Sequence, residues 1–363
     1  MAKDIIKLGD VATYINGYAF KPEDRGEEGL QIIRIQDLTG NSYDLGFYNG
    51  KYPKKIEIND GDVLISWSAS LGVYVWNGGK ALLNQHIFKV KFDKVDIDKS
   101  YFVYAVRYKL NDMGKKTHGA TMKHIVKRDF DATEIPYPPL KKQIEIAINL
   151  DKVLMVIKER KRELKLLDEL IKARFVEMFG DPVKNPKGWE VVTIGDIVTE
   201  VRYGTSKPAV EGGKYPYLRM NNLTADGHLD LNDLKYIDIP DDEIEKCVVR
   251  KGDVLFNRTN SIELVGKTVV FDLQEDMIIA GYIIRVRLNK RLLPEILSQY
   301  MNLEALKDIL RSMAKGAVNQ ANINAQELQS IKVYIPDMEL QKQFIEMKNQ
   351  VDKSKVTVQK AFE

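Results

Sequence analysis

A stretch without glycine or proline runs from Leu140 to Phe179 and constrains this chain more than any other feature. Pro138 and Pro139 precede it and Gly180-Asp181-Pro182 follows it, which are signals for the start and the end of one helix. Forty residues with a rise of 1.5 Å each form a rod of roughly 60 Å, whereas the average helix has about 11 residues. The fold is therefore organised around one very long helix.

Apolar residues recur along this stretch in alternating steps of three and four, the heptad pattern of a helix that packs against another helix. The seam consists of Leu150, Leu154, Ile157, Lys161, Leu164, Asp168, Ile171, Phe175 and Met178, with charged residues at two of its positions. A similar seam follows Pro336, at Leu340, Phe344, Met347, Val351, Ser354, Val358 and Ala361. We expect these two helices to pair. The alternative is that the first is a solvated linker.

Short sequence matches occur in the same order in the two halves of the chain. They are Gly9-Asp10 with Gly195-Asp196, Lys21-Pro22 with Lys207-Pro208, Arg34 with Arg219, Leu38-Thr39 with Leu223-Thr224, Gly61-Asp62-Val63-Leu64 with Gly252-Asp253-Val254-Leu255, Gly119-Ala120 with Gly316-Ala317, and Gln143 with Gln343. One match would be chance, but several in register indicate an internal duplication.

Each half is expected to be mixed α/β, so the chain belongs to the α+β class. Short β-branched or aromatic runs between turn residues indicate strands at 30–35, 63–67, 72–76 and 87–92, and at 215–220, 248–249, 254–256, 267–271 and 278–288. Residues 101–110 and 292–313 have helical patterns. A length of 363 residues fits two domains.

Composition excludes several classes of protein. No apolar run approaches the roughly 20 residues that span a bilayer, and the N-terminus lacks a secretory pattern. The single cysteine, Cys247, allows no internal disulfide and fits a reducing cytoplasm, which is the expected location. The net charge of +3 is only weakly basic, so binding to nucleic acid has to be argued from local clusters.

Few residues suggest catalysis. No glycine-rich loop follows a strand in a cofactor-binding pattern, and no Asn-Pro-Pro-aromatic tetrapeptide of an amino-methyltransferase occurs. Pro240-Asp241 begins like a nuclease motif, but Glu245 lies directly beside Lys246, so the spacing fails. The four histidines have no cysteine at zinc spacing. We therefore expect no catalytic residue, no metal and no cofactor in this chain.

Polar residues gather instead at matched places in the two halves. Arg, Asn, Gln, Ser and Thr read base edges, while Lys and Arg hold phosphates, so these clusters are candidates for DNA binding. The candidates are Arg34, Gln36, Ser66, Trp67, Ser68, Lys115, Lys116, His118, Thr121, Lys123 and His124 in the first half, and Arg219, Asn221, Asn222, Arg258, Thr259, Asn260, Ser261, Lys315, Asn319, Gln320 and Asn322 in the second. Ordinary polar loops are the alternative for any one cluster. Recurrence with different residues favours a reader of two different half-sites.

The chain resembles the specificity subunits of Type I restriction–modification enzymes over its whole length. The helix end 167–182, the entry Pro138 to Gln143, the Gly-Asp-Val-Leu tract of both halves and residues 316–323 carry this resemblance. It implies two target-recognition domains, each binding one half of a split site in double-stranded DNA. It also implies two long antiparallel helices that relate the domains by a pseudo-two-fold axis and set their spacing.

The resemblance further implies partners. Two methylation subunits, which carry S-adenosylmethionine and the catalytic residues, dock on the helices, and restriction subunits then join. The helix residues concerned are Leu150, Leu154, Ile157, Leu164, Ile171, Phe175, Phe344, Met347, Val351 and Val358. The second helix has about 25 residues against 40 in the first, whereas family members usually continue further.

The expected organisation is a first recognition domain at 1–138, a spacer helix at 139–179, a hinge at 180–189, a second recognition domain at 190–337 and a second spacer helix at 338–363. Two other functions remain open at this point. An enzyme acting on DNA, a methyltransferase or a nuclease, would bind S-adenosylmethionine or cut DNA by itself. A coiled-coil interaction protein would not bind duplex DNA even with methylation subunits present.

Overall fold

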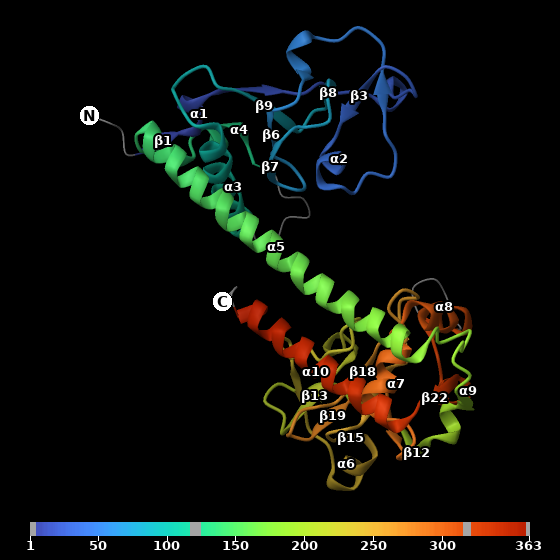
Figure 1. Cartoon of the computed structure of the whole chain (residues 1–363). Helices are drawn as coiled ribbons and strands as arrows, with labels where there is room; N and C mark the ends of the chain where they lie inside the picture. The colour runs from blue at the N-terminus through green and yellow to red at the C-terminus, as the bar shows by residue number, and fades with distance from the viewer. Residues whose placement is uncertain (1–4, 117–124, 315–320, 361–363) are drawn as a thin grey trace. The chain divides into compact units, whose positions relative to one another are not determined.

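The computed structural model describes residues 5–116, 125–314 and 321–360, with the backbone alone at 113–116. The chain divides into two compact units, Met1–Val156 and Ile157–Glu363 (Figure 1). Helix α5 extends from Leu140 to Phe179 and contributes to both. The 40-residue helix predicted from the sequence is therefore confirmed at both of its ends. Ion pairs one turn apart, such as Arg160–Glu163 and Arg174–Glu177, support its exposed face.

The described residues of the first unit form two four-stranded sheets and one two-stranded sheet. The first sheet is ordered β2 (Thr13–Asn16), β9 (Ile87–Lys91), β6 (Val63–Ser66) and β7 (Gly72–Val75), and the second is ordered β4 (Phe47–Tyr48), β3 (Leu30–Ile33), β8 (Ala81–Leu83) and β5 (Glu57–Ile58). β1 (Ile5–Lys7) pairs with β10 (Glu134–Pro136). Among the described residues, the α-helices besides α5 are α1 (Leu8–Val11), α2 (Ile35–Thr39), α3 (Lys99–Lys116) and α4 (Lys127–Asp131).

The second unit repeats these three sheets in the same strand order and has one further strand pair. Its sheets are ordered β12 (Val198–Tyr203), β20 (Ile283–Leu288), β16 (Val254–Asn257), β18 (Thr268–Val270), and β14 (Lys235–Ile237), β13 (Tyr215–Leu218), β19 (Met277–Ile279), β15 (Val248–Val249). β11 (Glu190–Thr193) pairs with β22 (Lys332–Ile335), and β17 (Thr259–Asn260) with β21 (Ala321–Asn322). The α-helices in the described part of this unit, besides the end of α5, are α6 (Asp241–Cys247), α7 (Pro294–Met301), α8 (Glu304–Met313), α9 (Ala325–Ser330) and α10 (Met338–Lys360). The parallel pair recurs as β3–β8 and β13–β19, so the duplication is one of topology.

The repeated Gly-Asp-Val-Leu tract has a structural role in both units. The Asp62 carboxylate accepts the backbone N–H of Asn59 at 2.8 Å and forms an ion pair with Lys89 of β9 at 2.8 Å. Asp253 likewise accepts the N–H of Arg250 at 2.9 Å and pairs with Arg287 of β20 at 2.8 Å. In each unit, the aspartate therefore closes the turn before the buried strand and neutralises a basic side chain on the adjacent strand of the sheet.

A buried glutamine near the start of α5 and α10 holds the start of another helix. The Gln143 side chain accepts the N–H of Asp98, just before α3, at 2.9 Å, and donates to the carbonyl of Pro138 at 2.8 Å. Gln341 accepts the N–H of Leu293, just before α7, at 2.9 Å and donates to Pro336 at 2.9 Å. The counterpart of Gln143 is therefore Gln341, and the match with the exposed Gln343 is wrong.

Two segments predicted as continuous elements are divided. Residues 278–288 change sheets at Ala280 to Tyr282, where the Ala280 N–H donates to Leu218 and the Gly281 N–H to Thr205. Residues 292–313 break between α7 and α8, because the Leu303 N–H turns back to the carbonyl of Tyr300. The expected hinge at 180–189 packs on the second unit: the Tyr300 hydroxyl donates to Pro182 at 2.8 Å and the Trp189 indole to Phe179 at 2.8 Å.

Within the second unit, α10 runs antiparallel to the end of α5. Asp168 contacts Lys355, whereas Phe175 and Phe179 both pack on Phe344, with ring centroids 5.2 and 5.6 Å away. Residues of increasing number along α5 thus contact residues of decreasing number along α10, which is the predicted antiparallel arrangement. Ile171, Phe175 and Phe344 are buried in the core; Met347, Val351 and Met178 pack at its edge.

The seam differs from the predicted one at two places. Ser354 is exposed, and Lys355 takes its place on the buried face beside Val358, because a helix of 3.6 residues per turn drifts from a strict heptad. Leu150 and Leu154 are 38% and 43% exposed, while Ile157 and Leu164 are half-buried. Ala361 lies outside the described residues.

Candidate nucleic-acid interface

The loops that follow β6 and β16 have the same backbone geometry in the two units. The Trp67 N–H donates to the carbonyl of His86 at 3.3 Å, and the Trp67 carbonyl accepts the N–H of Ile125 at 3.0 Å. Arg258 makes the equivalent pair of bonds, to the carbonyl of Tyr282 and from the N–H of Ile323, both at 2.9 Å. Trp67 and Arg258 therefore occupy equivalent positions. In each unit, a backbone hydrogen bond therefore joins this loop to a distant segment, which begins near Ile125 in the first unit and near Ile323 in the second.

In the second unit, a network of amides and hydroxyls shapes the loop. The buried Asn257 side chain donates to the carbonyls of Thr259 and Tyr282, both at 3.2 Å, and accepts from Asn260 at 2.8 Å. The Thr259 hydroxyl donates to Asn322 at 3.3 Å. Thr259 and Asn322, predicted from clusters far apart in the sequence, thus lie together, but the Thr259 side chain is buried and holds the loop. Ser261 is half-buried in the same turn.

Arg258 is half-buried and presents the guanidinium of this loop. Its guanidinium carbon lies 5.0 Å from the ring centroid of Tyr203, at the end of β12, and one of its nitrogens donates to the carbonyl of Gly281 at 3.5 Å. Tyr203 and Tyr282 are 44% and 50% exposed beside it. Sequence analysis missed both tyrosines, since an aromatic residue at a strand end has no local pattern that distinguishes it from a core residue.

In the first unit, the equivalent loop is built on aromatic stacking. The Trp67 ring stacks on Phe88, with centroids 5.6 Å apart and an interplanar angle of 24°, and lies 5.0 Å from the ring of His86. Ser66 and Ser68 are buried, and the Ser66 hydroxyl donates to the carbonyl of Ser70 at 2.5 Å. The prediction that these two serines face DNA is therefore corrected: both are turned into the unit, and Ser66 supports the loop.

The candidates after β3 and β13 are largely engaged within the chain. Arg34 forms an ion pair with Asp37 at 3.2 Å, and Arg219 with Asp233 at 2.6 Å. Asn222 is buried and accepts the N–H of Arg219 at 2.8 Å, so its predicted base-reading role is corrected to that of a cap. Gln36 is half-buried and Asn221 is exposed in these turns. Of this group, Asn221 alone presents an exposed side chain.

The remaining candidates fall where the structure gives no side-chain description. Lys115 and Lys116 end helix α3, but their side chains are not described. His118, Thr121, Lys123, His124, Lys315, Asn319 and Gln320 lie outside the described residues. The predicted basic run of the first half therefore stays a prediction.

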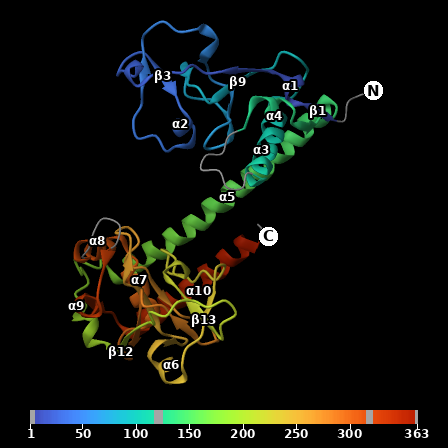
Figure 2. The same ribbon diagram turned by 180° about the vertical axis from the view of Figure 1, so that it is seen from behind.

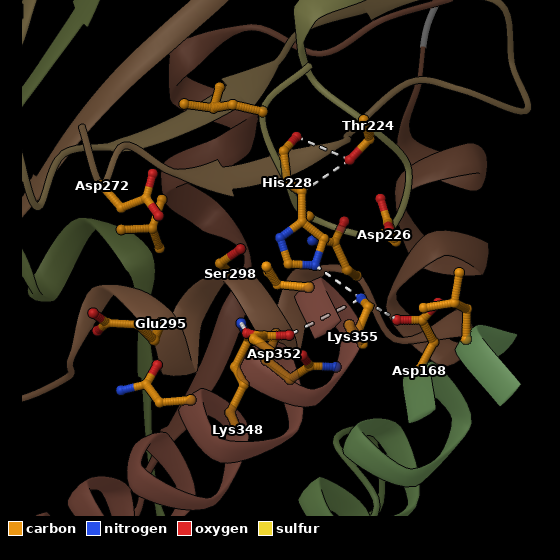
Figure 3. A pocket seen from close by; sticks show the side chains of 18 of the residues that line it. Asp168, Thr224, Asp226, His228, Asp272, Glu295, Ser298, Lys348, Asp352 and Lys355 are labelled. Carbon is orange, nitrogen blue, oxygen red and sulfur yellow. Dashed lines mark hydrogen bonds and ion pairs between the residues drawn. The ribbon is translucent and has the colours of Figure 1, made fainter. Parts of the chain in front are cut away.

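A charged cavity of about 690 Å³ lies in the second unit between α5, α7, α10 and the turn at 224–229 (Figure 3). Lys355 sits at its centre: its ammonium lies 2.5 Å from Asp168 and 3.3 Å from Nε2 of His228. The hydroxyl of Thr224 accepts the N–H of His228 at 2.9 Å and fixes the turn. Burial lowers the pKa of His228, and the charge of Lys355 lowers it further.

The cavity lacks the pattern of a metal centre. Within residues 5–116, 125–314 and 321–360, no three His, Cys, Asp or Glu side chains are grouped so that they could hold a metal ion. None of the helices in the same ranges is long and apolar enough to cross a membrane. The cavity is therefore a charged contact region within the second unit, where α5 and α10 meet the turn at 224–229.

Comparisons with known proteins identify relatives over nearly the whole chain. The family model for the Type I restriction modification DNA specificity domain matches twice, at residues 3–166 and 186–361, which confirms the duplication. The EcoBI specificity subunit of a Type I restriction enzyme from Escherichia coli is 25% identical over 373 residues, covering 94% of this chain and 77% of that protein. The EcoKI specificity subunit from Escherichia coli strain K12 is 26% identical over 392 residues, covering 98% and 83%.

A solved structure supports the fold. A chain from a structure concerned with assembly and conformational transition of the type I R-M system aligns with a TM-score of 0.60 at 18% identity, covering 98% of this chain and 92% of that chain. At 18% identity this likeness shows a shared fold only. The aligned residues include both units.

Proposed function

Since this chain belongs to the family of Type I restriction–modification DNA specificity domains, we propose that it is the non-catalytic subunit that reads a bipartite site in double-stranded DNA. Each unit reads one half of the site. The observation that carries this proposal is the equivalence of Trp67 and Arg258, which occupy one backbone position in two copies of one topology. Two units with the same backbone framework but different side chains at the ends of their loops are suited to reading two different half-sites.

The chemistry of the two tips supports different modes of contact. A guanidinium donates through a planar fork and can pair with two acceptors of one base edge. An indole packs its ring against apolar and sugar surfaces. The basic residues around Lys115 and Lys123 then supply phosphate contacts, which position the protein and weaken with salt.

Partners are part of the same proposal. Two methylation subunits that carry S-adenosylmethionine dock on the long helices, restriction subunits join them, and the complex works in the cytoplasm. Exposed apolar side chains along the first part of α5 support docking there, because exposed apolar residues that form a contiguous patch mark an interaction surface. They include Ile144, Ile148, Val153, Leu154, Met155 and Val156. The domain boundaries are proposed as 1–138, 139–179, 180–189, 190–337 and 338–363.

Exchange of one unit tests the proposal. Residues 1–135 are replaced by those of a relative, and the variant is expressed with the methylation subunit in a host whose methylated motif is then sequenced. We expect one half of the motif to change and the other half and the gap to stay. A matched exchange of residues 190–337 should change the opposite half. A change in both halves after either exchange, or in neither, contradicts the assignment of one half-site to each unit.

A further inference from the structure

The side chain of Arg258 lies against an aromatic face supplied by another strand. Arg258 follows β16, whereas Tyr203 ends β12, and β20 lies between these two strands in the sheet. The guanidinium carbon lies 5.0 Å from the Tyr203 ring centroid, within the range of a cation–π contact. The ring contacts the face of a guanidinium and not its edge, so this contact does not itself occupy the in-plane donors. One of them donates to the carbonyl of Gly281 at 3.5 Å.

Tyr203 is held both through its backbone and through its side-chain hydroxyl. Its backbone pairs with Ile284 of β20, and its hydroxyl accepts the N–H of Ala325, the first residue of α9, at 2.8 Å. β12 and α9 lie on the same side of the second unit in both views (Figures 1 and 2). The next residue, Gly204, fixes the path of the chain, since a Cβ there would lie 2.1 Å from the carbonyl oxygen of Ile279. The ring is thus a rigid platform.

The same platform also anchors the segment after residue 320. The Arg258 carbonyl accepts the N–H of Ile323, and the Tyr203 hydroxyl accepts the N–H of Ala325 two residues later. Backbone and ring together therefore tie the β16 loop, the end of β12 and the start of α9 into one assembly. Ordering these groups before a ligand arrives lowers the entropy that binding would cost.

The first unit places other side chains at these two positions. The Gly17 N–H donates to Ile87 at 3.1 Å as the Gly204 N–H donates to Ile283 at 3.1 Å, so the residue equivalent to Tyr203 is Asn16. The residue equivalent to Arg258 is Trp67, which stacks on Phe88. The arginine on a tyrosine at this loop is therefore particular to the second unit, although the framework is common to both. This indicates a role specific to one half-site.

We propose that Tyr203 is a positioning residue that holds the guanidinium of Arg258 for bidentate contact with one guanine of the second half-site. The inference rests on the proposed function and adds the base and the residue that orients its reader. Guanine presents O6 and N7 as paired acceptors in the major groove, the arrangement that a guanidinium fork matches best. Tyr203 acts through Arg258, so its loss affects discrimination at that one base pair.

The test uses the full chain assembled with its methylation subunit on a duplex that carries the methylated motif. Each guanine of the half-site assigned to residues 190–337 is replaced in turn by 7-deazaguanine or by another base, and the ratio of affinities for intact and altered duplex is measured. This ratio does not depend on the fraction of active protein. We expect one guanine at which the wild-type ratio is roughly tenfold or more and falls toward one in Arg258→Lys.

Substitutions of the platform separate positioning from stability. Tyr203→Leu removes the ring face and should lower the ratio at that guanine several-fold with no change at other positions. Tyr203→Phe keeps the face and should retain most of it. Tyr236→Leu is the matched control, because Tyr236 of β14 is equally exposed at 44%. An affinity that Tyr203→Leu lowers for all duplexes, with an unchanged ratio, overturns the positioning role.

The two proposals fail in distinguishable ways. A half-site for residues 190–337 without guanine, or a guanine whose ratio Arg258→Lys leaves unchanged, overturns this inference while sequence-specific methylation persists. Absence of any sequence-specific binding by the wild-type complex would instead contradict the proposed function.

Discussion

The ammonium of Lys355 on α10 lies 2.5 Å from a carboxylate oxygen of Asp168 on α5, although 187 positions separate them in the chain. The Lys355 side chain is only 9% exposed, and that of Asp168 is 32% exposed. His228 and Asp352 face the same ammonium, at 3.3 and 4.0 Å. The charge that interrupts the apolar seam of α5 thus has a partner, and the contact fixes the register of the two helices.

Loss of the acidic partner should destabilise the second unit. In Asp168→Asn, the buried ammonium of Lys355 keeps only its weaker neighbours, and we expect a cost of about 1–2 kcal/mol, since Asp168 is partly exposed. Lys355→Met removes the charge with little change in length and should cost less than about 1 kcal/mol. Thermal unfolding of the full chain, in a double-mutant cycle, measures the coupling. Additive effects of the two substitutions would show that the contact contributes nothing.

The stability of the second unit should fall in mild acid because of His228. Burial lowers its pKa, Lys355 and Lys348 lower it further, and Asp226 and Asp352 act in the opposite direction. Below about pH 6.5 the unfolded chain takes up a proton more readily than the folded protein does. The contribution of His228 to stability is therefore fully present above about pH 6.5. It is lost as the pH falls from there toward the lower pKa of His228 in the folded protein.

The measurement is the melting temperature of wild type and His228→Gln between about pH 7.5 and 5, on either side of the ordinary histidine pKa. The wild type should lose more stability than the variant over this range, and the difference isolates His228 from the other histidines. Parallel curves for the two proteins would contradict the lowered pKa.

We expect a second change of stability at alkaline pH, caused by the titration of Lys307. Lys307 is buried in the second unit and donates to the carbonyl of Gly266 at 2.6 Å, and burial lowers the pKa of its ammonium to about 8. The unfolded chain binds this proton up to about pH 10.4, so stability should rise as the pH increases from about 8 to about 10. The gain is on the order of 3 kcal/mol.

Comparison of wild type with Lys307→Met between about pH 7.5 and 10.5 measures this gain, with Lys246→Met as the control at an exposed lysine. The slope should become smaller in Lys307→Met and keep its size in the control, and the remainder includes Lys267, whose pKa burial also lowers. A slope of equal size in all three proteins would assign it to other groups.

Lengthening α5 should lengthen the gap of the recognised site. Four residues inserted after Glu163 add roughly 6 Å of helix and rotate the remainder of α5 by about 40° beyond a full turn. One base pair of B-DNA rises about 3.4 Å, so the gap should grow by about one or two base pairs while the half-sites stay the same. The methylated motif of the insertion variant measures this. An active variant with its original gap would show that α5 does not set the spacing.

The sequence determined the features that depend on local signals. The bounds of α5 follow from its flanking prolines and glycine, and the duplication follows from tracts such as Gly61 to Leu64 that recur in order. The polar composition of the loop at Arg258 was also readable, because turn residues mark the end of a buried strand. These signals need no knowledge of which strands become neighbours.

Only the tertiary structure decided which of these residues meet and which face solvent. The contact of Arg258 with Tyr203, and that of Lys355 with Asp168, depend on strand order and helix register, which no local pattern specifies. The same register turns Ser66 and Asn222 inward, although their residue types favour an exposed loop. The sequence alone therefore located the polar loops that follow the buried strands, while the packing of distant segments decided which side chains those loops present.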